Sequence, residues 1–404
     1  MGACPLLLCT GSAIPLDSGC RGEAPVMLEI LLWGAIGMLF YIYAGYPLLA
    51  IALGRLFPRP VLRGDFEPSV TVIISAYNEE RSIGAKIRNT LALDYPKEKL
   101  DIIVASDASD DGTDRIVLDC AEPRVRLLRV EGRQGKTACQ NAAAALADGE
   151  ILVFADATTT VENHALRAIV RNFHDPDVGC VAGRLVYTSR QGDATGRGGI
   201  SYWKYECALR IAESSLGSLI GVSGLLYGVR ANSYRPIAPD LISDFVIAMD
   251  MREQGLRTVL EPEAVCYEET LDRSDRELSM RIRVTLRSLL ALARNRHLLN
   301  PFRYGAFAWQ LASHKLLRYL SPVFWLVAIV ANIALAIQGQ YVSLLLAQAA
   351  GIAVGALGFR SKQAVAGSRL LAQPYYFLLT NLSSAISLVR FVRGERVVVW
   401  TPLR

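Results

Sequence analysis

Three short apolar runs in the first half of the chain each lead directly into a polar turn that carries carboxylates. The runs and their turns are Val70–Ser75 with Tyr77-Asn78-Glu79, Ile102–Ser106 with Asp107, and Ile151–Ala155 with Asp156. Such β-rich runs, separated by helix-length segments, predict βαβ units of a mostly parallel sheet. Ligands of open α/β sheets bind at the carboxyl ends of the strands, so we expect the three turns to converge on one crevice.

The apolar composition of the chain is concentrated outside this region. Hydrophobic residues make up 52% of the sequence and the mean hydropathy is +0.28. The excess lies in residues 26–57, 316–336, 341–358 and 370–391. Each stretch approaches or exceeds the roughly 18–20 apolar residues that span a bilayer. We therefore predict a membrane protein with one amino-terminal membrane helix and a carboxy-terminal membrane cluster.

These observations divide the chain into six segments. We predict an amino-terminal extension at 1–26, a transmembrane helix at 27–57, a cytosolic domain at 58–278, interfacial amphipathic helices at 279–315, transmembrane helices at 316–391 and a basic tail at 392–404. The extension is either disordered or precedes a true start at Met27. The amphipathic segment could equally be a packed surface helix, and the neighbouring membrane segments favour the interface.

The distribution of basic residues predicts the orientation of the chain in the membrane. Arginines gather beside the apolar stretches, which favours a position of the domain at 58–278 on the cytoplasmic face of the inner membrane. One span before the domain and three after it would place both termini outside. Arg390, Arg393, Arg396 and Arg404 instead indicate a cytosolic tail. We favour the cytosolic tail, with 370–391 not fully crossing.

Composition also excludes several classes of function. The net charge is only +5 and no nucleic-acid-binding module accompanies it, so no nucleic-acid partner is expected. The eight cysteines form no C-x-x-C pair, and the four histidines lack ligand spacing. A zinc enzyme or a dithiol redox protein is therefore not expected.

The order of the motifs carries a resemblance. Six motifs follow one another along the chain: Tyr77-Asn78-Glu79, S-D-A-S-D-D-G-T from Ser106, Gly135-Lys136, D-A-T from Asp156, S-D at 243–244 and R-x-R at 281–283. In this the chain resembles membrane-bound family 2 glycosyltransferases, in the branch of the cellulose, hyaluronan and poly-N-acetylglucosamine synthases. The resemblance implies a GT-A-like α/β domain with a Rossmann-like, mixed and mostly parallel sheet, flanked by transmembrane helices.

The resemblance also assigns residues to the donor, a nucleotide sugar that is expected to be a UDP-sugar. Tyr77, Asn78, Glu79 and Asp107 would contact the base and ribose, although the first three could form a plain strand-to-helix turn. Lys136 would meet the diphosphate, although it could equally be a solvated lysine. Asp156 stands where the family's D-x-D motif begins and would bind donor and a Mg²⁺ or Mn²⁺ ion.

Two further residues are expected to carry the chemistry. Asp244 matches the acceptor base of the family, which removes a proton from the attacking hydroxyl; Ser243 or Asp244 could also cap a helix. Arg283 matches the arginine that stabilises the departing UDP. Trp203 and Gly224 would lie on the acceptor side, or could be ordinary core and turn residues.

The chain departs from the family pattern at four positions, the first being Ser243, which stands where the family has the Glu of its E-D pair. Thr158 replaces the second carboxylate of D-x-D, so either Asp156 holds the ion together with the diphosphate and water, or the dependence on a metal is weak. Met280 and Val284 replace the Gln and Trp of Q-x-x-R-W, and the lost Trp argues against long-chain synthesis.

We therefore expect an inverting membrane glycosyltransferase that extends a polysaccharide acceptor and could work with export or secretion partners. One alternative is transfer to a polyprenyl-phosphate or other lipid acceptor. Another is a non-catalytic nucleotide-sugar-binding subunit of a secretion complex.

Overall fold

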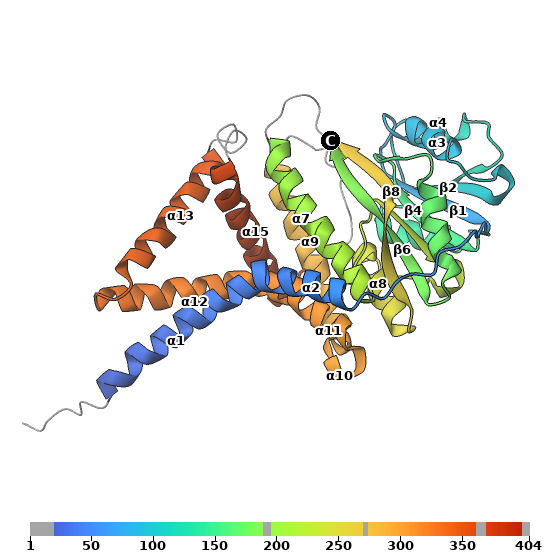
Figure 1. Ribbon diagram of the computed structural model, residues 1–404. Helices are drawn as coiled ribbons and strands as arrows, with labels where there is room; N and C mark the ends of the chain where they lie inside the picture. The colour runs from blue at the N-terminus through green and yellow to red at the C-terminus, as the bar shows by residue number, and fades with distance from the viewer. Residues whose placement is uncertain (1–19, 189–194, 270–273, 361–368, 398–404) are drawn as a thin grey trace, which may run out of the picture.

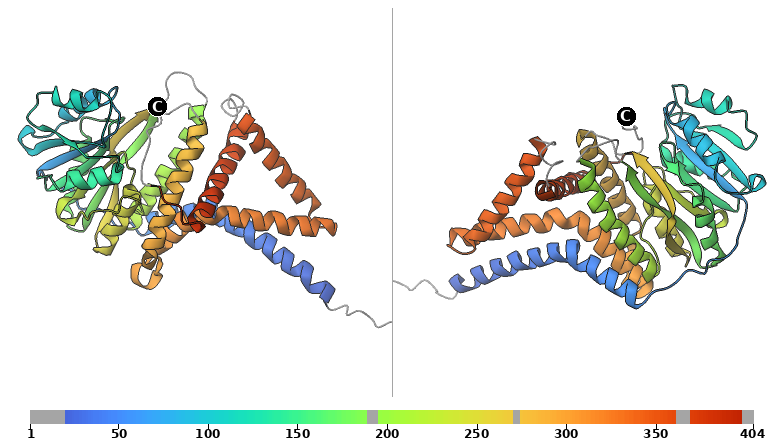
Figure 2. Two further views of the ribbon diagram at one scale, coloured as in Figure 1. Left: turned by 180° about the vertical axis from the view of Figure 1, so that it is seen from behind. Right: turned by 45° about the horizontal axis from the view of Figure 1, so that its top comes forward.

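The computed structural model describes residues 20–188, 195–269, 274–360 and 369–397. Its centre is an eight-stranded mixed sheet in the order β3-β2-β1-β4-β7-β6-β8-β5. The sheet belongs to a globular domain at one end of the molecule, and long helices extend from the other end (Figure 1). Helices α7 and α9 stand between the sheet and these helices in every view (Figure 2).

The first half of the sheet is parallel, as the sequence predicts. Strand β1 pairs in parallel with β2 and β4, and β2 pairs in parallel with β3. The elements are β1 (Val70–Ala76), α3 (Ile83–Leu91), β2 (Leu100–Ser106), α4 (Thr113–Leu118), β3 (Val125–Arg129), α5 (Lys136–Ala144) and β4 (Ile151–Asp156). The carboxyl ends of β1, β2 and β4 therefore open on one edge of the sheet.

The second half of the sheet is mixed. Strand β7 runs antiparallel to both β4 and β6, while β6 and β8 are parallel. The elements are β5 (Thr160–Val161), α6 (Ala165–Val170), β6 (Val178–Thr188), α7 (Thr195–Leu216), β7 (Leu226–Arg230), α8 (Ser243–Glu253) and β8 (Arg257–Glu269).

Two apolar cores cover the two faces of the sheet. Along β1, Val70, Val72 and Ile74 pack into one core and Ile73 packs into the other, because successive side chains of a strand point to opposite faces. Every residue of β1 is buried. This explains why the strand reads as a continuous apolar run instead of an alternating one.

Within the described ranges, four helices are long and apolar enough to cross a membrane: Pro25–Leu56, Ala306–Ile337, Val342–Phe359 and Ala372–Val392. The elements involved are α1 (Cys20–Phe40), α2 (Tyr46–Leu56), α11 (Ala306–Gln310), α12 (Leu317–Ile337), α13 (Val342–Arg360) and α15 (Arg369–Val392). Helices α1 and α12 lie side by side, whereas α13 and α15 form the other two sides of an open triangle with α12 (Figure 1).

The first and second membrane-type helices each contain a π-helical turn. Tyr41–Gly45 separates α1 from α2, and Leu311–Leu316 separates α11 from α12. Pro47 lies in the first turn of α2, where its missing N–H fits the local widening of the helix. Residues 306–315 thus continue into the second membrane-type helix without a break.

Helix α9 (Ser274–Arg294) buries the apolar face that the sequence predicts. Leu286, Leu289 and Leu292 are at most 5% exposed and face protein, because α9 packs on both the domain core and α15. A short helix, α10 (Pro301–Tyr304), follows it. The interfacial placement of 279–315 stays a prediction.

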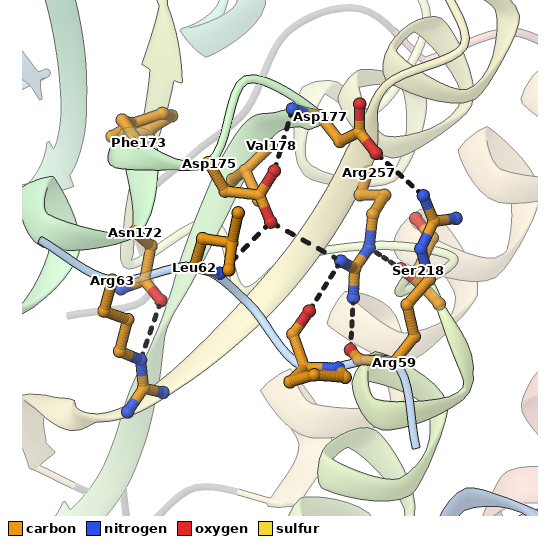
Figure 3. A network of polar contacts seen from close by, with 12 residues as sticks. Arg59, Leu62, Arg63, Asn172, Phe173, Asp175, Asp177, Val178, Ser218 and Arg257 are labelled. Atoms are coloured by element: carbon orange, nitrogen blue, oxygen red, sulfur yellow. Dashed lines mark hydrogen bonds and ion pairs between the residues drawn. The ribbon is translucent and has the colours of Figure 1, made fainter. Parts of the chain in front are cut away.

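The segment between α2 and β1 is fastened to the domain by one buried arginine (Figure 3). The Arg257 guanidinium donates to the carbonyls of Arg59, Pro60 and Gly217 at 2.7, 3.1 and 2.7 Å. Asp175 lies 3.7 Å away and supplies the counter-charge. This network fixes the domain relative to the amino-terminal helix.

Candidate active site

The turns after β1 and β2 are bonded to each other. The backbone N–H of Asn78 donates to Ser109 Oγ at 3.1 Å, and the side-chain Oδ1 of Asn78 accepts from the backbone N–H of Asp110 at 2.9 Å. Asn78 adopts a left-handed backbone with φ of 53°, a conformation that asparagine tolerates better than most residues. The Glu79 N–H donates to Thr113 Oγ1 at 2.7 Å. Asn78 and Glu79 therefore join the two turns at the carboxyl ends of β1 and β2.

Asp107 organises the loop that precedes α5. Its carboxylate is 3% exposed and accepts from the backbone N–H groups of Gln134 and Gly135 at 2.8 and 3.0 Å. The Arg133 guanidinium lies 3.4 Å from Asp107 and stacks 3.3 Å above the Tyr77 ring. Gly135 has φ of 89°, which favours glycine. Arg133 thus joins Asp107 and Tyr77 in one cluster.

Lys136, Asp156, Gly224 and Asp244 converge at the centre of the site. Lys136 forms an ion pair with Asp156 and donates to the Gly224 carbonyl at 3.0 Å. A Cβ added at Gly224 would lie 2.9 Å from Asp244 Oδ2 and 3.3 Å from Lys136 Nζ. Any larger residue at 224 would therefore displace these charged groups. Lys136 and Gly224, which are 88 residues apart in the sequence, meet here because β4 ends and α5 and α8 begin at this edge.

Asp244 does not cap its helix. The expectation that Ser243 or Asp244 could be the N-cap is wrong: Ile242 occupies the N-cap position and makes no side-chain cap bond. Burial raises the pKa of the Asp244 carboxyl, and Asp156 adds to this, while Lys136, Lys315 and Arg287 oppose it. A raised pKa makes the carboxylate a better proton acceptor.

Asp156 and Thr158 lie on the turn after β4. Asp156 is partly exposed beside Lys136, and Thr158 points to solvent. Across the described ranges, no three His, Cys, Asp or Glu side chains gather closely enough to hold a metal ion. Asp156 is the one carboxylate of this turn, so a divalent ion bound there would need further oxygens, such as those of the donor and of water.

The two central arginines of α9 differ in their surroundings. Arg287 is 7% exposed and donates to Thr137 Oγ1 at 3.1 Å and to the carbonyls of Pro239 and Leu241. It thereby holds the segment that leads into Asp244. Arg283, one turn earlier, is partly buried, and burial lowers the pKa of its guanidinium. Among the described residues it has neither a hydrogen-bond nor an ion-pair partner, as expected of a cation that awaits an anionic ligand.

Three charged residues near the site were missed by the sequence reasoning. Lys315 lies 5.3 Å from the centre of the Phe245 ring. Burial raises the pKa of Glu268 to about 7, with Asp156 adding and Lys136 opposing. Lys86 lies beneath the turn of Asp156. Of these three residues, only Lys86 could have been noticed in the sequence, because it interrupts the apolar stripe of α3 that includes Ile83, Ile87 and Thr90.

The predicted acceptor residues occupy different places. Gly224 lies against Asp244, as described above. Trp203 lies on α7, in a stretch whose side chains fall outside the described residues.

Comparison with known families settles the identity of the domain. Residues 71–223 match the sequence model of the family described as Glycosyl transferase family 2. This chain carries a family 2 glycosyltransferase domain. The match covers the turns of Tyr77, Asp107 and Asp156, the Gly135-Lys136 pair and α7.

Curated relatives share this domain at low identity. A beta-monoglucosyldiacylglycerol synthase of Trichormus variabilis is 26% identical over 217 residues, which are 50% of this chain and 46% of that protein. A poly-beta-1,6-N-acetyl-D-glucosamine synthase of Staphylococcus aureus is 24% identical over 215 residues, 52% of each. The chain therefore spans about half the length of the curated relatives it matches.

A solved structure shares the fold over nearly the whole chain. A mannosyltransferase of Pyrobaculum calidifontis, solved with GDP-mannose and Mn²⁺, superposes with a TM-score of 0.69 at 24% identity. The superposition covers 92% of this chain and 99% of that one. The predicted GT-A-like sheet flanked by membrane-type helices is confirmed.

Proposed function

We propose that the chain transfers a sugar, with inversion, from a nucleotide-diphosphate sugar to an acceptor hydroxyl. The convergence of Asp156, Lys136 and Asp244 around Gly224 carries this proposal. Asp156 and Lys136 suit the diphosphate side, while Asp244 suits the acceptor side. One carboxylate base is enough for a single inverting displacement, in which the acceptor oxygen attacks the anomeric carbon as its proton leaves.

The donor nucleoside would lie against the wall formed by the first two turns. Tyr77, Asn78, Glu79 and Asp107 are the residues that we assign to base and ribose. The side chains of Asn78 and Asp107 already accept hydrogen bonds from backbone N–H groups of the protein. Their contribution is therefore a preformed wall, which lowers the entropy lost when the nucleotide binds.

Departure of the nucleoside diphosphate leaves negative charge that cations must stabilise. Arg283 is suited to this because it is partly buried and has no partner among the described residues. Its planar fork can bind two phosphate oxygens at once. Lys136, which pairs with Asp156, adds a second cation.

A Mg²⁺ or Mn²⁺ ion would bind at Asp156 together with the donor. The ion would supply Lewis-acid stabilisation of the diphosphate. Because Thr158 leaves Asp156 as the one carboxylate of its turn, binding without nucleotide should be weak.

The first candidate acceptor is a growing polysaccharide, because one relative is named as a poly-N-acetylglucosamine synthase. A lipid acceptor is the second candidate, and two observations favour it. Another relative is named as a glucosyldiacylglycerol synthase. Phe245, next to the proposed base, is covered by Lys315 of a helix that can enter the membrane.

The orientation belongs to the same proposal. Nucleotide sugars are cytosolic, so the domain would face the cytoplasm at the inner membrane, with export or secretion partners possible on the far side. The arginines beside the apolar stretches support this orientation.

The test uses the full chain in nanodiscs with a panel of radiolabelled UDP- and GDP-sugars. Release of the nucleotide diphosphate together with transfer to product supports an enzyme. A high-molecular-weight product indicates a polysaccharide synthase, and an organic-soluble product indicates a lipid acceptor. A chain that binds nucleotide but transfers nothing to any acceptor would instead be a binding subunit.

A further inference from the structure

A buried lysine lies directly behind the turn that we assign to the donor diphosphate. Lys86 of α3 is 2% exposed. Its ammonium donates to the carbonyl oxygen and to the hydroxyl of Thr159, both at 3.0 Å. Its alkyl chain lines a small apolar hollow with Val72, Val153 and Ala155.

Thr159 transmits this contact to Asp156. The Thr159 hydroxyl donates to the Asp156 carbonyl at 2.9 Å, and the Thr159 N–H donates to the same oxygen at 3.3 Å. Lys86 therefore closes a chain of hydrogen bonds that sets the shape of the turn from Asp156 to Thr159.

The ammonium has no carboxylate in contact with it among the described residues. Burial lowers the pKa of Lys86 to about 8, and nearby Cys266 and Asp156 only partly oppose this. Burial raises the pKa of the Cys266 thiol to about 12, so Asp156 is the anion that Lys86 faces near neutral pH. A buried charge without a direct counter-ion is unfavourable for folding alone.

A lysine is not needed merely to hold this loop to α3. Asn89, on the same helix, fastens the next part of the same loop with neutral bonds to Val161 at 2.9 and 2.8 Å. A neutral side chain is thus sufficient to hold this loop to α3. The positive charge at 86 calls for a separate explanation.

We propose that Lys86 is a positioning residue for the donor diphosphate: it holds the Asp156–Thr159 turn in place and supplies a fixed positive charge behind it. The inference rests on the proposed function. The charge attracts the diphosphate through the turn, and the bonds to Thr159 keep Asp156 directed at the donor. Lys86 touches neither substrate nor reacting atoms.

The experiment measures equilibrium binding of UDP, GDP and uridine to the full chain in nanodiscs, in the presence of a chelator and again with Mn²⁺. The variants are Lys86→Met, Lys86→Gln and Lys86→Arg, with Asn89→Ala as the matched control. Lys86→Gln keeps a donor for Thr159 but removes the charge. Thermal unfolding of each variant reports whether it is folded.

We expect Lys86→Gln and Lys86→Met to weaken binding of the nucleoside diphosphate by roughly tenfold or more, since a charge in a low-dielectric interior acts over several ångströms. Uridine binding should stay unchanged, because uridine lacks the diphosphate. Lys86→Arg should recover part of the affinity. Asn89→Ala should lower the unfolding temperature while leaving diphosphate binding intact.

A folded Lys86→Gln variant that binds UDP and GDP within about twofold of wild type would overturn the charge role. Equal losses of binding affinity for uridine and for the nucleoside diphosphates would show that Lys86 has only a structural role, and would also overturn the inference. A wild-type chain that binds neither UDP nor GDP would overturn the proposed function together with this inference. If Lys86→Met fails to fold, Lys86→Gln and Lys86→Arg decide the question.

Discussion

At the scale of single residues, the site is a set of charges held close together by backbone geometry. Lys136 joins Asp156 to the Gly224 carbonyl, and Gly224 leaves room for Asp244. The motif residues could be predicted from the sequence because each follows an apolar strand. Lys315 and Glu268 could not be assigned, since their proximity depends on how the second membrane-type helix and β8 pack on the motif turns. Lys86 stands out in the sequence as a lysine in the apolar stripe of α3, but its contact with the turn of Asp156 depends on how α3 packs.

Arg283 yields the first prediction. Arg283→Ala should lower kcat by roughly 10²-fold or more, because it removes charge stabilisation that matters most as the diphosphate leaves. Arg283→Lys should recover only part of the rate, since lysine lacks the bidentate fork. Steady-state kinetics with the preferred donor measure both. A fully active lysine variant would refute the bidentate geometry.

Asp250 yields a prediction about pH. Burial raises its pKa to about 6, Glu253 adds to the rise, and Arg235 opposes it. Because the folded pKa lies above the ordinary value, ionisation of Asp250 costs stability that accumulates between about pH 4 and pH 6 and remains above it. Asp250→Asn should therefore stabilise the fold by about 1–3 kcal/mol at pH 7.5 and by much less at pH 4.

The measurement for Asp250 is the thermal midpoint of wild type and variant at the two pH values. An equal difference at pH 4 and pH 7.5 would contradict the prediction, because it would show that the effect does not come from ionisation.

At the scale of elements, the sequence predicted the first half of the sheet well and the junction with the membrane poorly. β1, β2 and β4 coincide with the predicted apolar runs, because a buried parallel strand is continuously apolar. The predicted helix after Leu241 appears as α8, but its N-cap differs. The pairing of β6 with β8, the π-helical turn at Leu311–Leu316 and the choice of what covers the apolar face of α9 depend on long-range packing that no local pattern encodes.

The junction of α2, α7 and the second membrane-type helix contains a buried charge network. His314 contacts Glu213 through Nδ1 at 2.6 Å and Glu206 through Nε2 at 3.0 Å, and Tyr46 donates to Glu213. Arg318 pairs with Glu206 at 3.2 Å. His314 and Glu213 are 2% and 1% exposed, so water cannot replace a lost partner.

We therefore predict that His314→Leu destabilises the protein by about 3–5 kcal/mol, since it leaves Glu213 and Glu206 buried without their shared partner. The matched control is His297→Leu. His297 makes a comparable contact with Glu253 at 2.5 Å, but its side chain is 47% exposed, so the loss should be below about 1 kcal/mol. Thermal unfolding in nanodiscs measures both. Similar losses at the two sites would contradict the role assigned to the buried network.

At the scale of the whole molecule, the domain and the membrane-type helices form one connected structure. Arg257 fastens the segment after α2, and α9 joins the domain core to α15. α15 packs on α9, whereas α1 packs on α12. α15 also packs on α13 and α12, and its length and composition would allow it to cross, so the expectation that this last apolar segment does not fully cross the bilayer stays a prediction.

The corresponding prediction concerns the side on which the chain ends. Arg393→Cys, at an exposed position after α15, should resist a membrane-impermeant thiol reagent added to intact cells. Gln340→Cys, in the exposed turn between α12 and α13, should react. Both are placed in a background whose accessible native cysteines are replaced by serine. Reaction at 393 from outside would show that α15 crosses fully.

The most direct measurement of the central claim compares the wild-type chain, Asp244→Asn and Asp250→Asn for nucleotide release and sugar transfer with the donor panel. Asp250 lies on the same helix as Asp244 but is assigned no part in the reaction. The account predicts transfer by wild type and by Asp250→Asn. Asp244→Asn should lose roughly 10²–10⁴-fold in rate while still binding the nucleotide. Retention of more than about a tenth of the wild-type rate by Asp244→Asn, or transfer from no donor by the wild-type chain, would contradict it.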